Sequence, residues 1–133
     1  MSLQAKITTF IGTLKTDFPA ALGMMSEDIT WINRLPEHIP FNGEFHGHEG
    51  IARYFQLLAE NFELGNYDLD SFDFIETDDT LVIVGCEAGG KVIPTGKVFD
   101  LDFVWVVRFD SEGRISYLRE HNDTAAIGAA FTA

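Results

Sequence analysis

The chain has 133 residues, of which 46% are hydrophobic, and its formal net charge is −12. This length and composition predict a single folded domain over residues 1–133 and exclude a disordered chain, while the negative charge argues against nucleic acid as a partner. No apolar run approaches the roughly 20 residues of a membrane span, no signal segment is evident at the start, and Cys86 is the single cysteine, so we expect no membrane partner and a cytoplasmic setting.

The first third of the chain predicts two helices followed by a strand. Five apolar residues recur at the spacing of an amphipathic helix: Leu3, Ile7, Phe10, Ile11 and Leu14. Pro19 suits the first turn of a shorter second helix over residues 20–25. The β-branched and aromatic run 29–33 then predicts a first strand, and strand character ends near Pro36.

The middle of the chain predicts a loop, a helix and the start of a sheet. Residues 36–47 have the Pro, Gly, Asn and His content of a loop. A third helix is expected over about residues 49–62, ended by Gly65 and Asn66, because apolar residues recur there at helical spacing: Ile51, Phe55, Leu58 and Phe62. Four strand-like segments follow, 67–76, 81–89, 97–109 and 114–123, and residues 124–131 could add a helical turn or two. This order predicts the α+β class with a mostly antiparallel sheet.

The last predicted strand carries polar residues on both of its faces. One face bears Leu118, Glu120 and Asn122, and the other bears Arg119, His121 and Asp123. One of these sets must point inward, and burial of a charged group is costly unless the group is paired or changes its protonation. A concave sheet around a pocket would accommodate either set.

The two faces lead to different sites. A register shift of one residue would exchange them. If Arg119, His121 and Asp123 faced the pocket, the His–Asp pair would form an acid–base dyad. If they face outward, they belong to a dimer surface or to solvated ion pairs.

Three segments carry a resemblance to a known family: FHGHEGIARYFQLL at 45–58, TGK at 95–97 and SEGRISYLREHND at 111–123. Together with the order of elements, they resemble the SnoaL-like polyketide cyclases of the nuclear-transport-factor-2-like (NTF2-like) superfamily, which also holds ketosteroid isomerase and limonene epoxide hydrolase. The resemblance implies a cone-shaped sheet wrapped against helices, an apolar pocket open at one end, no metal or organic cofactor, and a homodimer formed through the outer sheet face.

The resemblance also implies roles for individual residues. Glu120 falls on the catalytic aspartate of limonene epoxide hydrolase, and Trp31 and Asn33 fall on the Tyr-x-Asn pair that orients its water. The Arg-x-Asp pair of that enzyme falls on Cys86 and Ala88, which argues against epoxide hydrolysis. The first-helix tyrosine of ketosteroid isomerase has no counterpart, since no tyrosine precedes residue 54. The expected pocket lining is Phe55, Leu58, Cys86, Leu101, Phe103, Trp105, Leu118 and Asn122.

These assignments lead to a chemical hypothesis. A carboxylate in an apolar setting loses hydration, so its pKa rises, and Glu120 becomes a competent proton shuttle near neutral pH. It would remove a proton next to the carbonyl of a small apolar compound, with Asn33 and Trp31 as orienting groups and donors to the enolate. In the competing interpretation, Glu120 is exposed or paired with an arginine, and the protein binds a ligand or dimerises without catalysis.

Two other features are not expected to supply chemistry. His46 and His48 flank a glycine and precede Glu49, but no third and fourth metal ligands follow at a suitable spacing, so we expect these histidines to flank the pocket entrance rather than to bind a metal. Cys86 has no basic residue nearby in the sequence, so we expect an inert, buried thiol rather than a nucleophile.

Overall fold

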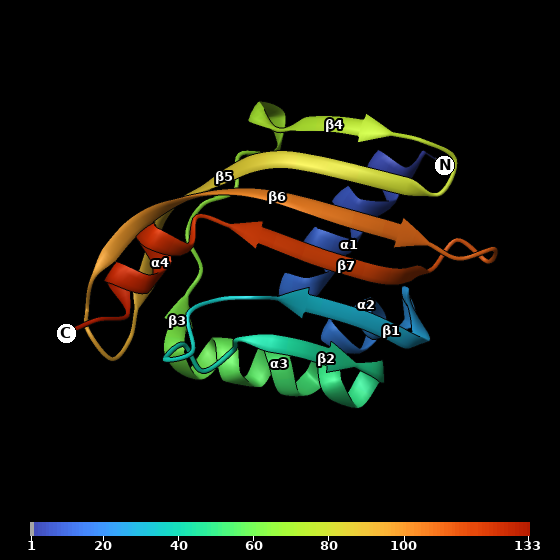
Figure 1. Ribbon diagram of the computed structural model, residues 1–133. Coiled ribbons are helices and arrows are strands. Elements are labelled where there is room, and N and C mark those ends of the chain that lie inside the picture. The colour runs from blue at the N-terminus through green and yellow to red at the C-terminus, as the bar shows by residue number, and fades with distance from the viewer. Residues whose placement is uncertain (1) are drawn as a thin grey trace.

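The computed structural model describes residues 2–133 as one curved sheet with helices packed against it (Figure 1). The elements are, in chain order, α1 (Leu3–Thr16), α2 (Phe18–Gly23), β1 (Met25–Asn33), β2 (Gly43–His46), α3 (Gly47–Asn61), β3 (Phe62–Glu63), a 3-10 turn (Leu69–Ser71), β4 (Asp73–Glu76), β5 (Thr80–Val92), β6 (Val98–Phe109), β7 (Ile115–Asn122) and α4 (Thr124–Ala130).

The sheet has seven strands in the order β2-β1-β7-β6-β5-β3, and β4 also pairs with β5. The pair β1 and β7 is parallel, and the other strand pairs are antiparallel. In Figure 1, α1 and α2 lie behind the sheet, and α3 runs along its lower edge behind β2. The predicted α+β class with a curved, mostly antiparallel sheet is confirmed.

Aspartate or serine side chains cap the N-termini of three of the helices. Ser2 caps α1, Asp17 caps α2 and Asp123 caps α4, each by accepting a hydrogen bond from a backbone N–H in the first turn. Because Asp17 is the cap and Pro19 follows in the first turn, the second helix starts at Phe18 rather than at residue 20.

Other predicted boundaries are wrong as well. Strand β1 starts at Met25 rather than at residue 29, and β5 ends at Val92 rather than at residue 89. The expected loop 36–47 contains strand β2, whose residue Phe45 pairs with Trp31 of β1. The third helix ends at Asn61, because Phe62 takes extended backbone and pairs with Val92 of β5. The expected strand 67–76 is interrupted by the turn at Leu69–Ser71, so only its last four residues form β4.

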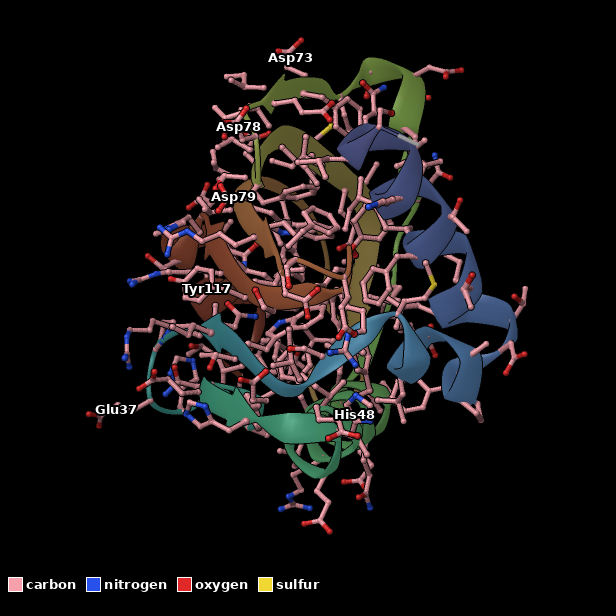
Figure 2. All side chains as sticks on the ribbon, turned by 90° about the vertical axis from the view of Figure 1, so that its right-hand side faces the viewer. Glu37, His48, Asp73, Asp78, Asp79 and Tyr117 are labelled. Atoms are coloured by element: carbon pink, nitrogen blue, oxygen red, sulfur yellow. The ribbon has the colours of Figure 1, made fainter. Side chains whose placement is uncertain are left out.

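The core lies between the concave face of the sheet and the helices (Figure 2). Its large, fully buried side chains come from both layers and include Ile7, Phe10, Ile51, Leu81, Ile83, Ile115 and Leu118. Acidic residues Glu37, Asp73, Asp78 and Asp79 lie at the periphery of the molecule in Figure 2. No helix within residues 2–133 is long and apolar enough to cross a membrane.

Candidate functional site

Two adjoining cavities lie between the sheet and α3, and α1 forms part of the wall of the larger one. The larger has a volume of about 150 Å³ and the inner one about 40 Å³. The larger cavity is walled mostly by apolar side chains of α1 and α3, including Phe10, Leu14, Phe55 and Leu58. Six residues line both cavities: Tyr54, Leu58, Leu64, Tyr67, Trp105 and Glu120. The acid from the last strand therefore faces an apolar cavity.

Glu120 is held in place by donors from two other elements. Its Oε2 accepts a hydrogen bond from Trp31 Nε1 on β1 at 2.8 Å and another from the Tyr54 hydroxyl on α3 at 2.7 Å. Trp31 reaches the carboxylate because β1 runs parallel to β7, in a register that pairs Asn33 with Glu120. The carboxylate is thus oriented by both layers of the fold.

The surroundings of Glu120 shift its proton affinity. Burial raises the pKa of Glu120, hydrogen bonds from Tyr54, Trp31 and Asn122 lower it, and the charge of Glu87 raises it further, with a net result above the usual value of 4.5. Burial and the neighbouring Glu120 charge raise the pKa of the Tyr54 hydroxyl, so Tyr54 stays a donor. An acid with a raised pKa exchanges protons more readily near neutral pH.

Asn33 connects Tyr54 and Asn122 through hydrogen bonds. It is buried, and its Nδ2 donates to the Tyr54 hydroxyl oxygen at 3.0 Å, while its Oδ1 accepts from Asn122 Nδ2 at 2.9 Å. Asn33 borders the inner cavity and not the larger one. Its contacts therefore position Tyr54, whereas the sequence suggested that Asn33 orients the substrate directly.

The predicted lining residues divide between the cavities. Phe55, Leu58 and Trp105 line the larger one, and Leu101, Phe103, Trp105 and Asn122 line the inner one.

Two lining predictions are wrong. Leu118 has no exposed surface and packs in the core, away from both cavities. Cys86 is exposed on the outer face of the sheet, where it pairs with Asp102 of β6. Because Cys86 is exposed, the expectation of a buried thiol is also wrong.

The alternative polar set lies outside the cavities. His121 is exposed, Arg119 is half-buried, and Asp123 caps α4 by accepting a hydrogen bond from Ala126 N at 3.1 Å. Neither cavity is lined by any of the three. The register of β7 therefore turns Glu120 and Asn122 toward these cavities, while His121 and Asp123 border a separate, open depression on the outer face of the sheet.

Sequence reasoning missed a second buried acid, Glu87. It is 3% exposed, and it accepts hydrogen bonds from the Tyr67 hydroxyl at 2.5 Å and from Gly65 N at 2.7 Å. Burial and the Glu87 charge raise the pKa of Tyr67. The buried residues Leu81 and Ile83 share its face of β5, but Val82 and Val84 make the opposite face equally apolar, so the sequence does not tell which face points inward.

Tyr54 was also missed as a site residue, although its place on the inward face of α3 can be predicted from the sequence. It follows Ile51 by three residues and precedes Leu58 by four, so it shares the inward face of α3.

The histidines of the preceding segment have structural contacts: His46 Nδ1 hydrogen-bonds the Thr30 hydroxyl, and His48 Nε2 hydrogen-bonds the Met25 carbonyl. Among residues 2–133, no three His, Cys, Asp or Glu side chains cluster in a way that could hold a metal ion.

Solved structures share this fold over nearly the full chain. An NTF2-like protein from Burkholderia xenovorans is 24% identical with a TM-score of 0.85, covering 99% of this chain and 98% of that chain. A candidate polyketide cyclase from Pseudomonas putida is 11% identical with a TM-score of 0.79, covering 98% of each chain. A candidate isomerase from Bacillus subtilis is 18% identical with a TM-score of 0.77, covering 96% of this chain and 90% of that chain. The molecule thus has the NTF2-like fold.

A sequence model of the SnoaL-like domain family matches residues 11–118. The chain therefore belongs to the SnoaL-like domain family, and the resemblance seen in the sequence is confirmed. No curated protein sequence matches it.

Proposed function

We propose that this protein is a cofactor-independent acid–base enzyme of the cyclase or isomerase type, acting on a small apolar carbonyl compound. The observation that carries the proposal is Glu120, a partly enclosed carboxyl group with a raised pKa at the wall of an apolar cavity. Its hydrogen bonds from Trp31 and Tyr54 fix its direction without neutralising its charge.

In the proposed reaction, Glu120 works as a proton shuttle. The carboxylate takes a proton from the carbon next to the substrate carbonyl, the C–H electron pair forms a C=C bond, and the C=O π pair moves to the carbonyl oxygen to give an enolate. In isomerisation, Glu120 returns the proton to a different carbon. In cyclisation, the enolate carbon attacks a second carbonyl of the same molecule, and Glu120 protonates the new alkoxide. The enclosing apolar side chains exclude water and strengthen the electrostatic interactions of the site.

Hydrogen–deuterium exchange tests the proposal. In D₂O, ¹H NMR follows the loss of the α-proton signal of 2-tetralone, an apolar bicyclic ketone, with and without protein. We expect exchange above the buffer rate, and we expect Glu120→Gln to reduce the enzymatic rate by at least ~100-fold, because proton transfer by a positioned group contributes about 10²–10⁴. Glu37→Gln, which changes an exposed carboxylate, is the matched control and should keep the wild-type rate. Exchange at the buffer rate would contradict the proposal.

A non-catalytic ligand-binding or dimerisation module is the second candidate. It is favoured by the hydrogen bonds of the tyrosines: both hydroxyl hydrogens are donated to carboxylates and are not free for an enolate oxygen. Binding of a ketone in the cavity would broaden its NMR signals. Binding without proton exchange would support a ligand-binding protein without catalysis.

We also propose a homodimer through the outer face of the sheet. Four valines meet there across β5 and β6: Val82 pairs with Val106, and Val84 pairs with Val104. Val84 is 39% exposed, an apolar contact surface that a second copy would cover. A cytoplasmic setting is supported by the exposed free thiol of Cys86, which reducing conditions preserve.

A further inference from the structure

The two lysines of α1 have contrasting surroundings. Each ammonium group lies near an aromatic ring: Lys6 Nζ is 5.8 Å from the ring centre of Phe109, and Lys15 Nζ is 5.7 Å from that of Tyr67. Lys6 borders an open depression that is also lined by four acids, Asp78, Asp79, Asp110 and Glu112. Lys15 borders the larger, apolar cavity instead. The two side chains therefore share a helix and a type of aromatic contact but differ in the groups around the charge.

Lys15 lies at the opening of the larger cavity. Among the lining residues, Lys15 is exposed and Leu64 is 49% exposed, whereas Phe10 and Trp31 are buried. Ile11 and Lys15 are one helical turn apart and both line the cavity. The aliphatic stem of Lys15 thus continues the apolar wall formed by α1, and its ammonium group stays at the solvent boundary.

The two ends of the cavity carry opposite charges. Lys15 and Glu120 are the charged side chains among the residues that line it. The Glu120 carboxylate is held at the inner end by hydrogen bonds from side chains of β1 and α3. The ion pairs formed within residues 2–133 do not include Lys15. An anionic group at the opening would therefore meet a cation, whereas the same group at the inner end would meet a like charge.

We propose that the ligand of the larger cavity bears a carboxylate that binds Lys15 at the opening, while its apolar body fills the cavity. The like charge of Glu120 disfavours the reverse orientation. This inference rests on the proposed function and deepens it, since it names the substrate class of the same site: carbonyl compounds with an apolar body and a terminal carboxylate. Lys15 is then the residue that selects the charged end of the substrate and directs the rest of it toward Glu120.

Two probes isolate the effect of the charge. 2-Naphthylacetate and 2-naphthylacetamide have nearly the same shape, and only the first is an anion at pH 7. Their affinities for the wild-type protein are measured by titration of the naphthalene fluorescence at a fixed ionic strength. We expect 2-naphthylacetate to bind about 3- to 10-fold more tightly, because a partly exposed ion pair at an apolar opening contributes an affinity gain of this order.

Three variants assign the preference to Lys15. Lys15→Met keeps an unbranched stem without the charge, so it should abolish the preference for 2-naphthylacetate. Lys15→Arg restores a cation and should retain the preference. Lys6→Met is the matched control, because it removes the same charge from the same helix, also beside an aromatic ring. It should leave the ratio of the two affinities unchanged.

A purely structural role of Lys15 gives a different result. Lys15 lies in the last turn of α1, where a cation stabilises the helix through its dipole. If that were its only role, Lys15→Met would lower the thermal stability and leave the ratio of the two affinities unchanged, which would overturn the inference. Equal affinities for the wild-type protein, an equal loss of preference in Lys6→Met, or failure of both probes to bind would also overturn it.

Failure of this inference can be told apart from failure of the proposed function. Proton exchange of 2-tetralone without a preference for 2-naphthylacetate would contradict only the carboxylate-binding role of Lys15. A preference that depends on Lys15, together with exchange of 2-tetralone at the buffer rate, would contradict only the catalytic proposal.

Discussion

Glu120 is the residue on which the account of the site depends, and Tyr54 is its closest hydrogen-bond donor. The donor stabilises the charged carboxylate and lowers the pKa that burial has raised. This balance keeps Glu120 able both to take and to release a proton. The Tyr54 hydroxyl therefore tunes the pKa of Glu120.

Tyr54→Phe should therefore move the pH dependence of proton exchange. Without the 2.7 Å hydrogen bond, the pKa of Glu120 rises, and the acidic limb of the profile, where the rate increases as Glu120 ionises, shifts to higher pH. At pH 7 we expect roughly a 10-fold slower exchange of 2-tetralone. Tyr117→Phe is the matched control, because Tyr117 lies against Arg108 at the outer side of the sheet (Figure 2). An unshifted pH profile for Tyr54→Phe would contradict the role of the hydroxyl.

The same pKa shift predicts how Glu120 affects stability. The folded-state pKa of Glu120 lies above the value of 4.5 for an exposed glutamate. The folded state therefore binds this proton more tightly than the unfolded state, and its ionisation costs stability as pH rises from about 4.5 through the folded pKa. Glu120→Gln should gain stability relative to wild type across that window and unfold a few °C higher at pH 7. Thermal unfolding at pH 4 and pH 7 checks this, and a difference between the two proteins that does not change with pH would contradict it.

Residue-level prediction from sequence was limited wherever the two faces of a strand were alike. On β7, strand periodicity grouped Leu118, Glu120 and Asn122 on one face, but both faces carry polar residues, so the sequence left open which face points inward. On β5, Leu81 and Ile83 alternate with Val82 and Val84, so hydrophobicity does not tell the inner face from the outer. The face that was chosen placed Cys86 inside and left Glu87 unnoticed.

At the scale of elements, a capping side chain marks where a helix begins, so some helix N-termini can be predicted from the sequence. Asp123 was considered as part of a pocket dyad, yet its carboxylate is the N-cap of α4. The pattern of a capping aspartate before an alanine-rich helix is local, and it was available in the sequence. In contrast, strand β2 has four residues and depends on its pairing with β1, which local composition does not reveal.

Asp123→Ala should cost about 1 kcal/mol of stability, since it removes the side-chain acceptor at the start of α4. Asp123→Asn keeps an acceptor oxygen and should lose less. Both variants should exchange the α-proton of 2-tetralone within about twofold of the wild-type rate, because Asp123 lines neither cavity. Chemical denaturation and the NMR exchange assay measure the two effects. A large loss of exchange at unchanged stability would contradict this prediction and support an acid–base dyad of His121 and Asp123.

At the scale of the whole molecule, the curved sheet creates two different faces. The concave face holds the core and the cavities, and the convex face carries the valines of β5 and β6. The order of helices and strands in the sequence predicted the α+β class with a mostly antiparallel sheet, whereas the curvature of the sheet was implied by the family resemblance. The cavities were expected only from the family resemblance, since their shape depends on side chains that meet from distant parts of the chain.

The apolar convex face predicts the oligomeric state. We expect light scattering after size-exclusion chromatography to give twice the chain mass of 14.9 kDa. Val84→Asp places a charge among the exposed valines and should shift the protein toward the monomer, because an unpaired charge in an apolar interface is unfavourable. Ile93→Asp, in the connection between β5 and β6 where the side chain is 45% exposed, is the control for a general effect of charge. A monomeric wild-type protein would contradict the dimer.

The titration of Glu120 itself tests the central claim most directly. Carbon-13 NMR of the side-chain carboxyl, assigned by its absence in Glu120→Gln, gives the pKa in the free protein. An acid enclosed at the wall of an apolar cavity should titrate clearly above 4.5. A pKa at or below that of an exposed glutamate would mean that water reaches the carboxylate freely, and the proposed proton shuttle would be wrong.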